Sequence, residues 1–61
     1  MTDKQIRQIW HEIEYAEPDI STERLLAMVV DQIKMESGEE LDYGDVIEAI
    51  ERLYKSELGE N

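Results

Sequence analysis

The chain has 61 residues, and 16 Asp and Glu against 6 Lys and Arg give it a formal net charge of −10 at pH 7. A chain this short forms one domain, residues 1–61, with a small core, because such a domain buries only about 60% of the surface that its unfolded form exposes. The charge disfavours direct contact with nucleic acid or anionic lipid and favours basic protein surfaces. The absence of cysteine excludes disulfides and thiolate zinc sites.

The first predicted helix spans about residues 3–16. Its apolar residues recur at i, i+3, i+4 and i+7 and form one stripe: Ile6, Ile9, Trp10 and Ile13. Thr2 or Asp3 can accept hydrogen bonds from the first free amides of this helix. Pro18 disfavours helical geometry at the residue before it, so the helix is expected to end near residue 16.

The second predicted helix begins near Ser21 or Thr22, with Asp19 as a competing cap, and it ends around Ser37 and Gly38. Its main apolar residues follow helical spacing over three turns: Leu25, Leu26, Val29, Val30 and Ile33. With Met28 and Met35 added, the apolar arc covers about 220° of the helix circumference, roughly twice what a one-sided helix needs.

This wide arc has two interpretations that the sequence does not separate. In the first, the middle helix is central and packs against both neighbours. In the second, Met28 and Met35, with Gln32 between them, form a seam for self-association or for a partner, since methionine side chains adapt to irregular interfaces. We refer to Met28, Gln32 and Met35 as the methionine seam.

The third predicted helix starts after Asp42, which can cap it, and Asp45 suits the positive end of the helix dipole. It is expected to end at Gly59. Its apolar residues are predicted to line one face: Val46, Ile47, Ile50, Leu53, Tyr54 and Leu58. The connections between the three segments are short, so the predicted fold is all-α: a small three-helix bundle, or a helical hairpin with a third packed helix, and dimerisation is expected.

Catalysis is not expected. The only histidine, His11, lies on a helix flank beside Glu14, and the sequence pattern places neither a nucleophile nor a cleft next to it. Residues 38–46 resemble the second half of an EF-hand loop with Asp45 at the last ligand position. However, Lys34 then occupies the first ligand position and Glu39 that of the required glycine, so we interpret the segment as an interhelical turn. No metal or cofactor is predicted.

Acidic residues are concentrated in the second half of the chain, where no lysine or arginine interrupts residues 35–51. We predict that six of them form a partner-binding face: Glu36, Glu39, Glu40, Asp42, Asp45 and Glu48. A row of carboxylates can accept hydrogen bonds from Lys and Arg side chains as a phosphate backbone does. A charge run can also be a solvated surface without a partner. Tyr15, opposite the apolar stripe of the first helix, and Tyr43, among acids at the start of the third, are both expected to be exposed and to suit an interface.

These features predict a non-enzymatic protein-interaction module. We expect a small acidic inhibitor or modulator of a basic, nucleic-acid-binding protein, which acts as a nucleic-acid mimic in a format common among phage regulators. The alternative is a helical subunit or assembly module of a larger complex, with acidity serving solubility. The longest apolar run, residues 25–30, is too short to span a membrane, and a cytoplasmic homodimer is expected.

Overall fold

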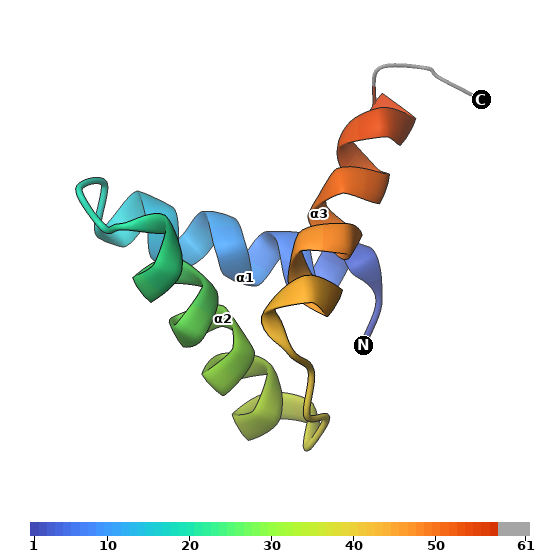
Figure 1. Cartoon of the computed structure of the whole chain (residues 1–61), viewed down its shortest axis with the longest axis horizontal. Helices are drawn as coiled ribbons and strands as arrows, with labels where there is room; N and C mark the ends of the chain where they lie inside the picture. Colours follow the sequence, from blue (N-terminus) through green and yellow to red (C-terminus); the bar gives the residue numbers. More distant parts are fainter. Residues whose placement is uncertain (58–61) are drawn as a thin grey trace.

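The computed structural model describes residues 1–57, which form three packed α-helices and no strand. The helices are α1 (Asp3–Ala16), α2 (Thr22–Ser37) and α3 (Tyr43–Glu57). α1 packs against both other helices, and α3 crosses α1 steeply so that its C-terminal half extends beyond the α1–α2 pair (Figure 1). The all-α prediction and the bounds of the first two helices are confirmed.

α1 and α2 begin at hydroxyl caps. Thr2 Oγ1 accepts a hydrogen bond from the Gln5 amide at 3.3 Å, and Gln5 Oε1 accepts one from the Thr2 amide at 2.8 Å. This reciprocal capping box satisfies two amides that the first turn leaves free. Ser21 Oγ accepts from the Arg24 amide at 3.3 Å, so Ser21 rather than Asp19 caps α2.

α2 ends at Gly38, whose backbone adopts the left-handed conformation with φ 77° and ψ 0°. Its amide donates to the Lys34 carbonyl oxygen at 2.9 Å, which closes the last turn. Glycine takes this conformation without the steric cost that a side chain would add. The chain therefore leaves α2 in a tight turn and reaches α3 within five residues.

Two aspartates hold the first turn of α3. Asp42 Oδ1 accepts from the Asp45 amide at 2.9 Å, while Asp45 Oδ2 accepts from the Asp42 amide at 3.2 Å. This is the capping-box arrangement with aspartate in the position that glutamate usually takes. The predicted end of this helix at Gly59 lies outside the described residues.

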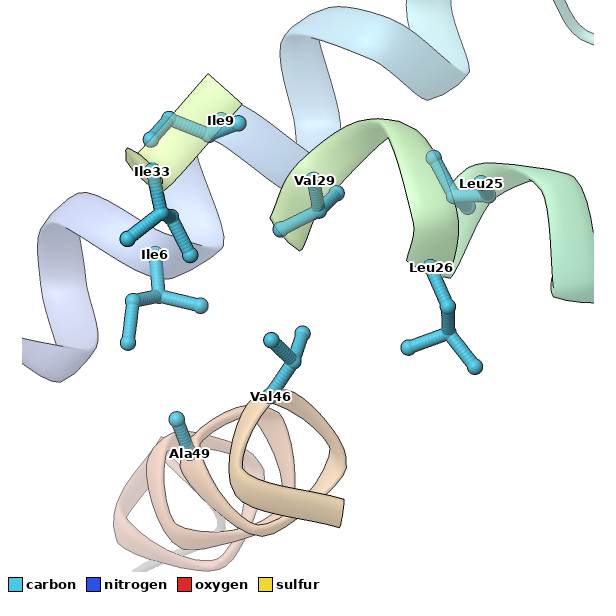
Figure 2. Close-up of a cluster of buried hydrophobic side chains, with 8 residues drawn as sticks. All are labelled: Ile6, Ile9, Leu25, Leu26, Val29, Ile33, Val46 and Ala49. Atoms are coloured by element: carbon cyan, nitrogen blue, oxygen red, sulfur yellow. The ribbon is translucent and has the colours of Figure 1, made fainter. Parts of the chain in front are cut away.

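The core consists of eight buried hydrophobic side chains, and no polar or charged residue among residues 1–56 is buried with them. α2 supplies half of the cluster, and α1 and α3 supply two residues each: Ile6, Ile9, Leu25, Leu26, Val29, Ile33, Val46 and Ala49. Figure 2 shows Val46 and Ala49 pointing from α3 toward the side chains of the other two helices. Trp10 packs against the edge of this cluster and stays partly exposed.

The predicted apolar face of α3 requires a correction. Val46 is buried, but Ile47 and Tyr54 are 41% and 61% exposed, and Ala49, which the apolar pattern did not include, is fully buried. The reason is geometric, because Val46 and Ala49 point toward the α1–α2 pair while Ile47 and Tyr54 lie about 100° away around the helix. α3 therefore carries two apolar surfaces, of which only one faces the core.

Candidate functional site

Five of the six predicted partner-binding acids lie at one end of the molecule. Glu36 belongs to the last turn of α2, Glu39 and Glu40 to the connection, and Asp42 and Asp45 to the start of α3. These segments meet at one corner of the fold, close to the amino terminus (Figure 1). We call these five residues the acidic end; the sixth, Glu48, lies one turn further along α3.

The acids of this region differ in their local partners. The N-terminal amine pairs with Glu39, and Lys34 pairs with Glu40 at 3.1 Å. Asp42 and Asp45 receive the capping amides described above, and the Glu48 carboxylate lies 3.9 Å from Arg52. Even with these pairs the acidic end holds more carboxylates than cations, so it keeps a net negative charge.

The ion pair between Asp3 and Arg52 joins the first turn of α1 to α3. Arg52 Nε and Nη2 donate to the two carboxylate oxygens of Asp3 at 2.9 Å and 3.0 Å. Through these hydrogen bonds the guanidinium holds the pKa of the Asp3 carboxyl below its usual value of 3.8. No local pattern predicts this pair, because the two residues are 49 positions apart in the chain.

This lowered pKa predicts how the contribution of the pair depends on pH. A carboxyl with a depressed folded-state pKa stabilises the fold above its unfolded pKa, and the contribution is lost as the pH falls through the folded pKa. We therefore expect Arg52→Gln to lower the urea midpoint at pH 7 and at pH 5, and the difference from wild type to shrink below about pH 4.

Arg24→Gln is the matched control for Arg52→Gln, since Arg24 is an exposed arginine on the first turn of α2. Its substitution should leave the urea midpoint nearly unchanged at every pH. An Arg52→Gln defect of equal size at pH 7 and pH 3 would contradict a role that depends on the ionised Asp3 carboxylate.

His11 is exposed and belongs to a local polar cluster on α1. Arg7 Nε donates to His11 Nε2 at 3.1 Å, and His11 Nδ1 lies 3.8 Å from the Glu14 carboxylate. Within residues 1–57, no group of three or more His, Cys, Asp and Glu side chains is arranged to hold a metal ion.

The methionine seam on α2 is only partly apolar surface. Met28 is partly buried, Gln32 is exposed, and Met35 is 75% exposed. α2 provides half of the buried core and contacts both other helices, but α1 packs more extensively on its two neighbours, so α2 is not the central helix of the first interpretation. The core does not cover Met35. Tyr15 is 91% exposed and Tyr43 is 46% exposed, in line with the expectation for both.

A second surface, of which the sequence analysis identified only Tyr43, lies along α3. Tyr43, Ile47 and Tyr54 are exposed, and Ile50 beside them is partly exposed. We call these four residues the α3 stripe. A small groove adjoins it where α3 crosses α1, lined by Arg7, Trp10, His11, Ile50 and Tyr54. The sequence analysis assigned Ile47, Ile50 and Tyr54 to the same face as Val46, because an apolar pattern does not show which of its residues a neighbouring helix covers.

Two findings complete the description. No helix within residues 1–57 is both long enough and apolar enough to cross a lipid bilayer. The chain matches no protein-family model, and comparisons with curated proteins and with solved structures found no match.

Proposed function

We propose that this protein is a non-enzymatic interaction module whose acidic end binds a basic surface of another protein. The observation that carries the proposal is the gathering of exposed carboxylates from three consecutive segments at one corner of the fold. A corner with excess negative charge on a domain of net charge −10 attracts lysine and arginine side chains and speeds the encounter with them.

The proposed partner is a protein that itself binds nucleic acid, and the acidic end then acts as an inhibitor or modulator. Carboxylate oxygens form charge-assisted hydrogen bonds with guanidinium and ammonium groups, as phosphate oxygens do. A basic groove that grips a phosphate backbone can therefore grip a row of carboxylates. The chain is further proposed to act as a homodimer, which gives a small domain additional buried surface.

The test variant neutralises acids that neither cap a helix nor pair with the chain terminus. Asp42 and Asp45 cap α3, and Glu39 pairs with the chain terminus, so these three stay unchanged. Glu36→Gln, Glu40→Gln and Glu48→Gln together change the net charge from −10 to −7. The matched control carries Glu12→Gln, Glu17→Gln and Glu23→Gln, which produce the same net charge with exposed residues elsewhere on the surface.

Wild type, test variant and control are used as baits, and each captured basic protein is then titrated against all three in purified form. We expect the test variant to bind about 10-fold to 100-fold more weakly than wild type, because each exposed charge pair contributes up to about 1 kcal/mol. The control should bind nearly as wild type does. Wild-type affinity should also fall between about 0.05 M and 0.5 M salt.

Two results would contradict the proposal. Equal losses in the test variant and the control would show that net charge, and not the acidic end, governs binding. Affinity that does not change with salt would show that carboxylates are not the principal contacts. Competition tests the proposal that the acidic end mimics nucleic acid. Excess duplex nucleic acid should displace this protein from a partner that uses one groove for both.

A further inference from the structure

The acidic end already holds an ammonium group that belongs to the chain itself. Lys34 Nζ lies 3.1 Å from Glu40 Oε1, although Lys34 belongs to α2 and Glu40 to the connection that follows it. Lys34 lies in the last turn of α2, where the negative end of the helix dipole favours a cation. The left-handed turn at Gly38 then changes the direction of the chain, and Glu40 lies within reach of the Lys34 ammonium.

This ion pair is exposed on both sides, so another cation can replace Lys34. The side chain of Lys34 is 59% exposed and that of Glu40 is 76% exposed. An exposed pair contributes little to stability, because water solvates both charges well when they separate. The Lys34 ammonium can therefore leave Glu40 at a small cost in free energy.

The other side-chain cation beside the predicted acids, Arg52, is held differently. Its Nη1 lies 3.9 Å from the Glu48 carboxylate, but its Nε and Nη2 donate to both carboxylate oxygens of Asp3 at 2.9 Å and 3.0 Å. Within residues 1–57, Glu40 is the only carboxylate with which Lys34 pairs. Lys34 is thus the exchangeable side-chain cation of the acidic end.

We propose that Lys34 is an autoinhibitory cation of the acidic end. In the free protein it occupies Glu40, and a lysine or arginine of the basic partner has to displace it. Lys34 also lowers the negative potential that attracts the partner. This inference rests on the proposed function and names a residue that regulates it: removal of the Lys34 charge strengthens binding, whereas removal of the acids weakens it.

The test uses a fluorescently labelled nona-arginine peptide as the basic probe and measures its dissociation constant by anisotropy at about 0.15 M salt. Lys34→Gln and the control Arg24→Gln both change the net charge from −10 to −11. Arg24 lies on the first turn of α2, about 15 Å from Lys34 along the helix, which is nearly two Debye lengths. We expect Lys34→Gln to bind about 5-fold more tightly than wild type, and Arg24→Gln less than about 2-fold.

A double-mutant cycle tests whether Lys34 acts through Glu40. If Lys34 competes for this carboxylate, most of the gain from Lys34→Gln should disappear when residue 40 is glutamine. We expect a gain of about 5-fold with Glu40 present and of about 2-fold or less in the Glu40→Gln background. Equal gains in the two backgrounds would show that Lys34 merely repels the probe from a distance, and they would overturn the proposal.

The same peptide separates failure of this inference from failure of the proposed function. The triple test variant of the acidic end and its triple control are titrated alongside the Lys34 and Arg24 variants. Equal binding by the test variant and its control, or no binding by wild type, would contradict the proposed function and this inference with it. Weaker binding by the test variant, with equal binding by Lys34→Gln and Arg24→Gln, would overturn this inference alone.

A conservative variant checks that the charge of residue 34 is responsible. Lys34→Arg keeps the cation and should bind the peptide as wild type does, while Lys34→Gln binds more tightly. Circular dichroism and the urea midpoint of both variants should match those of wild type, because the pair is exposed. A gain in affinity in Lys34→Arg equal to that in Lys34→Gln would contradict the role of the charge.

Discussion

Replacing Ile33 with alanine is expected to unfold a large fraction of this protein. Ile33 is fully buried as a member of the core cluster to which all three helices contribute (Figure 2). Truncating a buried isoleucine to alanine costs about 2–5 kcal/mol, since transfer energy is lost and a cavity remains. A domain of 61 residues is stable by roughly 3–9 kcal/mol, so the loss is comparable with the whole.

Urea denaturation followed by circular dichroism measures this effect, at chain concentrations low enough to populate the monomer. Ile33→Val removes one methylene and should cost about 0.5–1.5 kcal/mol, which gives a graded series. Met35→Ala is the control on the same helix, because Met35 is 75% exposed and its loss should change stability by less than about 0.5 kcal/mol. Equal effects at residues 33 and 35 would mean that α2 does not pack on this face.

Ala49→Leu is expected to push α3 away from the other two helices. The side chain of Ala49 is fully buried in the core cluster, where α3 crosses the α1–α2 pair. A larger side chain at a filled site forces neighbouring groups off their preferred rotamers, at a cost of about 1–3 kcal/mol. Leucine is almost as good a helix former as alanine, so helix propensity does not explain such a loss.

The urea midpoint and Trp10 fluorescence together test this prediction, because Trp10 packs against the core and lines the groove beside α3. We expect a lower midpoint and a changed emission maximum. Ala16→Leu is the matched control, since Ala16 is an exposed alanine at the end of α1 and should tolerate leucine. A stabilised Ala49→Leu variant would contradict the close approach of α3.

The helices could be predicted from the sequence because their signals are local. The apolar spacing of residues 6–13 and the capping groups Thr2, Ser21 and Asp42 each act within about one turn of the chain. Gly38 ends α2 through its own backbone conformation. None of these features depends on a distant residue, so the pattern alone located the starts of all three helices.

The candidate surfaces were less predictable from the sequence. The row of acids was visible, but the pairing of Glu39 with the chain terminus depends on how the start of the chain approaches the α2–α3 connection. Most of the α3 stripe was missed because periodicity counts apolar residues without showing which of them a neighbouring helix covers. The same limit concealed Ala49, whose small side chain gives a weak apolar signal yet lies at a close helix crossing.

The sequence by itself determined the three helices, their caps and the excess of negative charge, because these follow from local hydrogen bonding, side-chain periodicity and composition. Only the tertiary structure decided which side of α3 faces the core, and it brought Asp3 to Arg52. Those features depend on the crossing of α1 and α3, which is set by side-chain packing between segments distant in the chain.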